Sequence, residues 1–494
     1  MKKTTLVLTI VQAAIVVAVL LAIPAGLPLG VPGQWEWMRI SPKFAIPWAW
    51  LALGALFVIG YASFAALGAR ALSTAGSRWR EARWLVGLAS ASLVAQVAVT
   101  SAAPDECDLT KWAYVNFFTG SAGYFTIARD QAQGDAWRFL ADYPRWIESQ
   151  DSLHIGTHPP GLILAQCALL RVMSDHPGLA TNLERLEPPS TAEGFRQLAG
   201  IARRPVTRAE RGALFATSLI TLLACALVVI PLYLLARVAL SPRGAWCAAA
   251  LWPFAPSAIL FQPLADTAYP FLATSALALA AWSARPRRGP WPIVLAALAG
   301  GVMAFGSAFT LAFLPVGVMV ALVFLLERET SVGSRLIRIV ATGVGYVVPW
   351  LAIWLVTAAN PLTIALWNLH HHARFYDEYP RSYWRWLMVN PAELLLALGA
   401  ASSVWCLWSL ARPRGIPRSA LAAMLVLVLV NLTGRNLGEV ARLWMLFMPA
   451  LLPAAGGALD REGAAPAGLA ATTALLGAQT LALESMIQVV YPVS

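Results

Sequence analysis

Long apolar stretches recur along almost the whole chain, separated by short polar or proline-containing segments. A helix that crosses a bilayer needs roughly 20 mostly apolar residues. The pattern predicts thirteen such spans, at 5–23, 46–68, 84–103, 212–236, 245–262, 267–284, 291–308, 310–326, 337–357, 391–410, 418–433, 442–458 and 465–484. We therefore expect an all-α polytopic membrane protein.

One further apolar stretch, 161–173, is too short to cross a bilayer. Counting it as a span would invert every later loop and place the arginine-rich loops outside. We therefore predict a helix that lies at the outer interface, or dips into the membrane and returns. Residues 104–211 then form one long external segment with interfacial helices, and 359–390 form a second external loop.

The predicted spans and loops divide the chain into five regions. These are an N-terminal three-span region, the long external segment, a central transmembrane module, the second external loop and a C-terminal transmembrane module. They comprise residues 1–103, 104–211, 212–358, 359–390 and 391–494. The first span follows Lys2 and Lys3 without a clean cleavage site, so we expect it to be retained as a signal anchor.

Composition agrees with a membrane protein and excludes other classes. Only 12% of the residues are charged and the mean hydropathy is +0.64, whereas ordinary soluble domains are about 25% charged. Disordered chains are rich in charge and poor in apolar residues, which this chain is not. The five cysteines have no CxxC spacing, so they predict neither a disulfide scaffold nor a zinc or redox motif.

The net charge of +11 is best explained by membrane topology. With a cytoplasmic N-terminus, the inner face carries 18 basic and 5 acidic residues and the outer face 18 and 20. Short cytoplasmic loops collect Lys and Arg, so this asymmetry favours that orientation and does not call for nucleic acid. We predict a multi-pass protein of a bacterial plasma (inner) membrane whose active face is extracytoplasmic.

The outer face also collects the groups that chemistry would need. Under this topology all six histidines are external, and so are 20 of the 25 acidic residues. Titratable groups at a membrane are costly unless they are paired or used. The histidines are His154, His158, His176, His370, His371 and His372.

The long external segment opens with acidic residues. Asp105 and Glu106 directly follow the third span, where a carboxylate suits general-base catalysis or metal binding, with a solvated helix cap as the alternative. The string YFTIAR then runs from Tyr124 to Arg129 on a predicted surface helix. Its aromatic residues also suit a helix at the membrane interface.

The most specific string, DSLHIGTHPPG, runs from Asp151 to Gly161 and contains His154 and His158. Its two prolines open the short apolar helix, as prolines often do. A helix start leaves free N–H groups and a positive dipole end, which suit a phosphate. The string therefore predicts a phosphate-binding position at the rim of the membrane.

Two further positions lie on the outer face. Asp266 stands at the outer start of a predicted span, where capping the helix is the alternative role. The second external loop carries His371 and Arg374 within the string HHHAR. These residues could coordinate a metal or bind an anionic headgroup, with a solvated loop as the alternative.

The last candidate lies between the eleventh and twelfth spans, where Arg435, Glu439 and Arg442 occur within eight residues. An external arginine at the mouth of a helix can clamp a phosphate through two parallel hydrogen bonds. The alternative is a local ion pair between Glu439 and Arg442, which are three residues apart.

The order of these motifs resembles the GT-C superfamily of glycosyltransferases that use polyprenyl-phosphate sugars, such as protein O-mannosyltransferases and lipid A aminoarabinose transferases. The resemblance covers most of the chain after about residue 100. It rests on Tyr124 to Arg129, the HPPG string at His158, Asp266 and the run RLWMLFMPALLPAAG from Arg442. It implies a GT-C-like fold, an inverting enzyme, and a lipid phosphate near the HPP region.

The resemblance is incomplete where an acidic pair usually precedes the tyrosine of the first surface helix. Here Gly120 to Gly123 read GSAG. We therefore predict Asp105 as the catalytic base, with Glu106 or Asp151 as substitutes. The predicted substrate-binding residues, several of which face the phosphate, are Tyr124, Arg129, His154, His158, Asp266, His371, Arg374, Arg435, Glu439 and Arg442.

The expected reaction moves a sugar from a polyprenyl-phosphate carrier to a glycan, lipid or protein acceptor. No cofactor is certain, and a divalent metal is an open possibility. One alternative is a lipid or solute transporter or flippase, although transporters usually carry charges or broken helices at mid-membrane. Another is a glycan polymerase or ligase that uses a lipid pyrophosphate.

Overall fold

The computed structural model describes residues 3–41, 43–73, 77–132, 135–202, 205–286, 288–412 and 415–490. Regular structure in these ranges is helical except for two short antiparallel strand pairs. The strands are β1 (Gly30–Val31) with β2 (Trp35–Glu36), and β3 (Met38–Arg39) with β4 (Ile487–Gln488). Three basic residues predicted for the inner loops lie outside these ranges, namely Lys2, Arg287 and Arg414.

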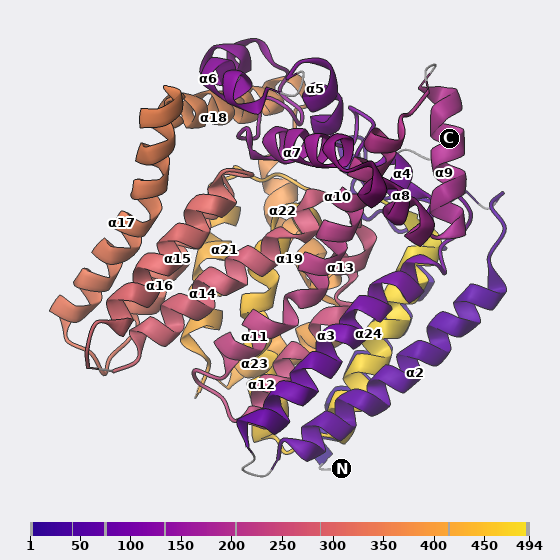
Figure 1. The fold of residues 1–494 in the computed structure, drawn as a ribbon. Helices are drawn as coiled ribbons and strands as arrows, with labels where there is room; N and C mark the ends of the chain where they lie inside the picture. Colours follow the sequence, from indigo (N-terminus) through magenta and orange to yellow (C-terminus); the bar gives the residue numbers. More distant parts are fainter. Residues whose placement is uncertain are drawn as a thin grey trace.

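Most helices form one bundle (Figure 1). Its helices are α1 (Lys3–Ala22), α2 (Trp48–Ala71), α3 (Arg78–Thr100), α10 (Arg208–Leu227), α11 (Val229–Ala236), α12 (Pro242–Ala249), α13 (Pro256–Leu260), α14 (Tyr269–Ala284), α15 (Trp291–Ser307), α16 (Phe313–Leu325), α17 (Val332–Thr357), α19 (Tyr383–Leu398), α20 (Ala400–Ala411), α21 (Arg418–Leu432), α22 (Val440–Leu443), α23 (Met448–Arg461) and α24 (Ala467–Met486). Four 3-10 turns interrupt the chain, at Ile147–Ser149, Trp252–Phe254, Ala265–Thr267 and Met445–Phe447.

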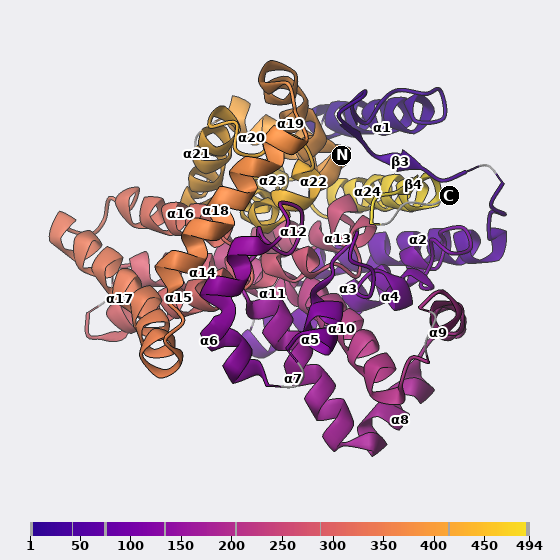
Figure 2. The same ribbon diagram turned by 90° about the horizontal axis from the view of Figure 1, so that it is seen from above.

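The remaining helices form a layer at one end of this bundle, and the first residues of α1 lie at the opposite end (Figures 1 and 2). The layer contains α4 (Lys111–Tyr114), α5 (Tyr124–Asp130), α6 (Ala136–Trp146), α7 (Gly161–Asp175), α8 (Pro177–Leu186), α9 (Pro189–Ile201) and α18 (Pro361–Glu378). The two segments that we predicted to be external therefore lie side by side.

The apolar helices define a helical membrane protein. Among the residues that the structure describes, six helices are long and apolar enough to cross a bilayer, counting Arg208–Ala236 and Val440–Arg461 as continuous units. A seventh would be α19 with α20, which meet at an angle of 114°. Three shorter apolar helices are α15, α16 and α21. The count of thirteen spans remains a prediction.

Three predicted elements take a different form. Residues 391–410 are not one straight span, because they are divided between α19 and α20, which meet at 114°. Residues 245–262 do not make one helix, because α12, a 3-10 turn and α13 follow one another there. Pro253 and Pro256 lack the N–H that a continuous helix needs, which explains the breaks. Residues 359–390 are not an open loop: they contain α18 and the start of α19.

The short apolar helix α7 lies across the end of the bundle (Figure 2). Its first residue, Gly161, donates its N–H to the carbonyl of Ala308 between α15 and α16, at 2.8 Å. A side chain at Gly161 would meet that carbonyl oxygen at 2.3 Å. The close approach therefore requires glycine and fixes the start of α7 against the bundle.

A buried ion pair joins the end layer to the last bundle helix. Lys111 of α4 contacts Glu484 of α24 at 2.6 Å, and both side chains are almost fully buried. An unpaired charge at such a position would be strongly destabilising. The pair therefore ties the beginning of the long external segment to α24.

Candidate functional site

Five predicted residues from distant segments come close together where the end layer meets the bundle. They are Tyr124 of α5, His154 of the loop before α7, Asp266 of the turn before α14, and Glu439 and Arg442 around the start of α22. Their charges influence one another: Asp266 interacts with Arg442, His154 and Glu439, and Tyr124 interacts with Asp266 and Arg442. We call these five residues the polar cluster.

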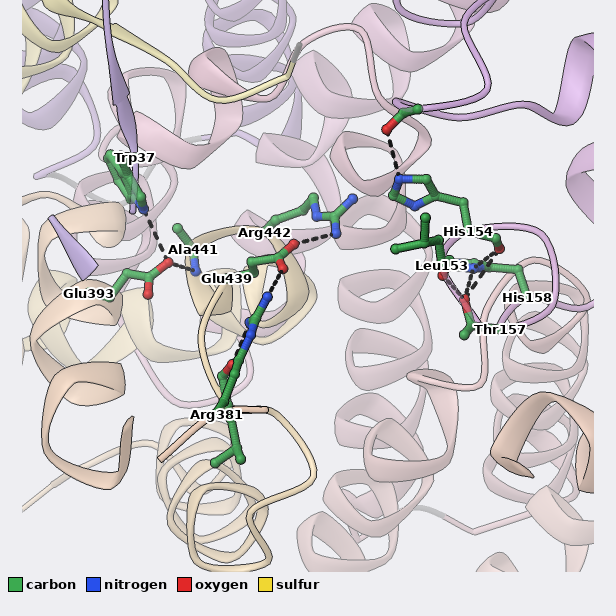
Figure 3. A network of polar contacts seen from close by, with 12 residues as sticks. Trp37, Leu153, His154, Thr157, His158, Arg381, Glu393, Glu439, Ala441 and Arg442 are labelled. Atoms are coloured by element: carbon green, nitrogen blue, oxygen red, sulfur yellow. Dashed lines mark hydrogen bonds and ion pairs between the residues drawn. The ribbon is translucent and has the colours of Figure 1, made fainter. Parts of the chain in front are cut away.

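Two arginines share the carboxylate of Glu439. Its Oε1 accepts a hydrogen bond from Arg381 at 2.8 Å, and its Oε2 accepts one from Arg442 at 2.7 Å (Figure 3). The ion pair three residues apart, considered above as the alternative role, is therefore present, but it is part of a larger group. One carboxylate between two guanidiniums leaves a net positive charge, which suits an anion.

The local backbone places Glu439 between these arginines. Glu439 has a positive φ of 57° and immediately precedes α22, and its side chain pairs with that of Arg442, three residues further on. Burial alone would raise the pKa of Glu439, but the charges of Arg442 and Arg381 outweigh burial and hold the pKa below its ordinary value. Glu439 is therefore a stable carboxylate and a poor proton acceptor.

Arg381 was not singled out from the sequence. Its guanidinium lies 5.2 Å from the ring centre of Phe375 and 5.8 Å from that of Trp386. Gly438, with a φ of +90°, lets the backbone approach it, because a Cβ there would lie 2.8 Å from Nη1 of Arg381. A cation held between aromatic rings is well placed but not freely mobile. Its position in the second external loop was the available signal.

Backbone contacts fix the two histidines of the DSLHIGTHPPG string. His154 places Nε2 3.1 Å from the carbonyl oxygen of Gly120, and His158 places Nδ1 2.9 Å from that of His154. The ring of Tyr124 stands 5.8 Å from the ring of His158. In Figure 3 the His154 ring faces Arg442, whereas His158 lies beside Thr157, further from Arg442.

Both histidines are neutral at neutral pH. Burial and the neighbouring His154 lower the pKa of His158 to about 3. Burial and the charge of Arg442 lower the pKa of His154. A neutral imidazole has one N–H and one acceptor nitrogen. Nε2–H of His154 donates to the carbonyl of Gly120, so Nδ1 is left to accept a hydrogen bond, for example from a sugar hydroxyl.

Asp266 is the carboxylate of the cluster best suited to accept a proton. Removal from water raises its pKa, although the charge of Arg442 opposes the change. Asp266 does not cap α14, because the N-cap position is Ala268 and makes no side-chain bond. Two nearby carboxylates with pKa values shifted in opposite directions are typical of divided roles: here Asp266 is the more basic and Glu439 the permanently ionised one.

The predicted bases of the long external segment lie elsewhere. Asp105 and Glu106 are exposed in the loop before α4. Glu106 acts instead on Tyr114, whose pKa burial and this charge raise to about 12. Asp151 is exposed at the edge of the cluster, where its Oδ1 accepts the N–H of Leu153 at 3.0 Å. The structure therefore brings Asp266, not Asp105 or Glu106, to the arginines.

Two predicted arginines also lie apart from the cluster. Arg129 forms two hydrogen bonds of 2.6 Å with Asp130 and lines a cavity of about 420 Å³ between α5, α7 and the start of α10. Arg435 is exposed, and its carbonyl accepts the hydroxyl of Tyr376 at 3.1 Å. Its charge contributes to the lowered pKa of His372, after burial. Arg435 is therefore a neighbour of the cluster rather than a member.

The two predicted residues of α18, His371 and Arg374, differ in their surroundings. His371 is buried, its Nε2 lies 2.9 Å from the carbonyl oxygen of Ile147, and its ring stacks on Trp367. Arg374 is exposed and pairs with Glu378 at 2.7 Å. Throughout the described ranges, no three His, Cys, Asp or Glu side chains gather to hold a metal ion.

No protein-family model matches the sequence, and no curated protein matches it. Among solved structures, the chain is similar to the oligosaccharyltransferase of Archaeoglobus fulgidus, crystallised in complex with Zn and sulfate. The two share 14% sequence identity with a TM-score of 0.37, over 79% of this chain and 53% of that chain. The chain thus spans about half the length of that protein. So distant a likeness does not decide function, which rests on the polar cluster.

Proposed function

We propose that the protein is a membrane glycosyltransferase that moves a sugar from a polyprenyl-phosphate carrier to an acceptor at the face formed by the end layer. The observation that carries this proposal is the polar cluster itself. Together with Arg381, it places two arginines around the carboxylate of Glu439, beside the more basic carboxylate of Asp266, at the end of a bundle of apolar helices. Such a site suits a ligand with a lipid tail and an anionic headgroup.

In the proposed reaction the acceptor's O–H or N–H loses its proton to Asp266 while its heteroatom bonds to C1 of the sugar. The bond between C1 and the phosphate oxygen breaks, and the electron pair leaves with the polyprenyl phosphate. Arg442, oriented by Glu439, stabilises the charge that develops on that phosphate. Attack opposite the leaving group inverts the configuration at C1. His154 would orient the headgroup as a neutral hydrogen-bonding partner.

The proposed orientation follows from the charge pattern. The loops opposite the end layer are rich in arginine, which favours a cytoplasmic position for them. The cluster would then face the extracytoplasmic side of a bacterial inner membrane, where a lipid-linked donor fits better than a nucleotide sugar.

Lipid binding tests the proposal directly. We expect purified protein to retain farnesyl phosphate, a short polyprenyl monophosphate, in native mass spectrometry. Added farnesol, which has the same tail without the phosphate, should not stay bound. Retention of neither lipid, together with uptake of a soluble solute, would assign the protein to transport. Retention of farnesyl pyrophosphate alone would assign it to the polymerase or ligase class.

The pH dependence of sugar transfer should reveal the ionisation of Asp266. A base works only when ionised, and the pKa of Asp266 is raised by burial, so kcat/KM should fall with decreasing pH at a higher pH than the value of about 3.9 for an ordinary aspartate. The pKa values of His154 and His158 are lowered, so any loss caused by their protonation should occur at a lower pH than for an ordinary imidazole. Profiles from pH 4 to 9 measure this, with exposed Asp151→Asn as the control. A transition near about 6.5 that disappears in His154→Gln would assign the base to histidine.

A further inference from the structure

The segment between α1 and α2 reaches the residues that hold the two arginines. Trp37 lies on this segment, just before β3, and is buried. Its Nε1–H donates to Oε1 of Glu393 on α19 at 3.3 Å. The same oxygen accepts the backbone N–H of Ala441, which directly precedes Arg442, at 3.0 Å (Figure 3). One carboxylate oxygen thus connects the N-terminal segment to the backbone that carries Arg442.

A second side chain of this segment holds the other arginine. Oε1 of Gln34 accepts the backbone N–H of Ser382 and the Nε1–H of Trp386, both at 2.8 Å. Its Nε2–H donates to Oγ of Ser382 at 2.7 Å. Ser382 directly follows Arg381, and Trp386 provides one of the rings beside its guanidinium. Gln34 therefore fixes both the backbone and the aromatic contact of Arg381.

These bonds converge on a backbone that needs support. Gly434, Gly438 and Glu439 all have positive φ values, and α22 is only four residues long. So short a helix gains little stability from its own hydrogen bonds. Its position therefore depends on contacts from neighbouring elements, of which the carboxylate of Glu393 is one.

We propose that Trp37 and Gln34 are positioning residues of the anion site: they hold Arg442 and Arg381 in place on the two oxygens of Glu439. The segment between α1 and α2 then contributes to the geometry of the site, in addition to connecting two helices. The inference rests on the proposed function only in that the anion is taken to be a lipid phosphate. Preorganised donors bind a charged group more tightly because they need no reordering.

Trp37→Phe tests the proposal because it keeps an aromatic ring and removes the indole N–H. Trp246→Phe is the matched control, since buried Trp246 of α12 donates its N–H to the carbonyl of Ala65 at 2.8 Å and its ring packs on Phe64 and Trp84, which are not cluster residues. The first readout is hydrogen exchange of the backbone segment 436–443, and the second is the Kd for farnesyl phosphate. We expect faster exchange and a Kd raised about three- to tenfold in Trp37→Phe alone, the effect of one lost hydrogen bond.

Gln34 offers a rescue series. Gln34→Leu removes all three of its bonds, whereas Gln34→Glu keeps the oxygen that accepts from Ser382 and Trp386. We expect Gln34→Leu to weaken farnesyl phosphate binding and Gln34→Glu to restore part of it, with similar melting temperatures for the two variants.

The two readouts separate the possible failures. Exchange and Kd that are the same in Trp37→Phe and Trp246→Phe would overturn the positioning role. Faster exchange in Trp37→Phe, in a protein that binds no farnesyl phosphate even as wild type, would support the positioning role and reject the proposed function.

Discussion

Replacing Asp266 by asparagine is expected to lower kcat for sugar transfer by about 10²- to 10⁴-fold, the usual contribution of a general base. The amide keeps the shape of the side chain but cannot accept the acceptor's proton. Binding of farnesyl phosphate should be retained, because the arginines remain. Transfer assays with a polyprenyl-phosphate sugar, paired with the binding assay, measure the two effects separately.

Asp105→Asn and Glu106→Gln are the controls for this prediction. Both carboxylates are exposed and belong to the loop before α4, so both variants should transfer at close to the wild-type rate. Full activity in Asp266→Asn, with loss of transfer in Asp105→Asn or in Asp151→Asn, would instead assign the base to the long external segment.

Arg442→Gln should lower kcat/KM by about 10²- to 10³-fold, as expected when one preorganised donor to a developing charge is removed. It should also weaken farnesyl phosphate binding, because a guanidinium contributes both charge and two parallel hydrogen bonds. Arg442→Lys keeps the charge but not the planar fork, so its activity should fall between those of the wild type and Arg442→Gln. Steady-state kinetics and lipid titrations measure these effects.

The matched control for Arg442 is Arg374→Gln. Arg374 also belongs to the end layer, but it is exposed and pairs with Glu378 one helical turn away. An exposed ion pair of this kind contributes little to stability. The kcat/KM of Arg374→Gln should stay within about twofold of the wild type. An equal loss in both variants would show that the outer face attracts the lipid only through its general charge.

The sequence predicted the helical elements well because apolar length is a strong signal in a membrane protein. Helices α2, α14 and α15 lie close to their predicted ranges. It failed at 245–262, where Pro253 and Pro256 break the helix inside an otherwise apolar stretch. Hydropathy alone does not register such breaks, because a broken helix buried within the protein can still be wholly apolar.

The site was predictable residue by residue, but its grouping was not. His154, Asp266 and Arg442 stood out as polar groups at the ends of apolar stretches. Their meeting depends on contacts between segments more than 100 residues apart in sequence, which no local pattern encodes. For the same reason the sequence alone did not show that Asp105, which follows the third span, lies apart from Arg442.

The hydrogen bonds from the N-terminal segment to the backbone beside Arg381 could not be predicted from the sequence for a related reason. Gln34 and Ser382 are 348 residues apart. A single glutamine in a polar link carries no periodicity or motif that would set it apart from an ordinary solvated side chain.

Glu439, shared between two arginines, acts as a resident counter-ion. An empty site at a membrane therefore never presents two bare positive charges, which would attract any anionic lipid nearby. Under the proposed function, the phosphate of a donor would bind by sharing the guanidiniums with Glu439. In the proposed reaction the departing phosphate would compete with the same carboxylate, which would favour turnover over tight retention of the product.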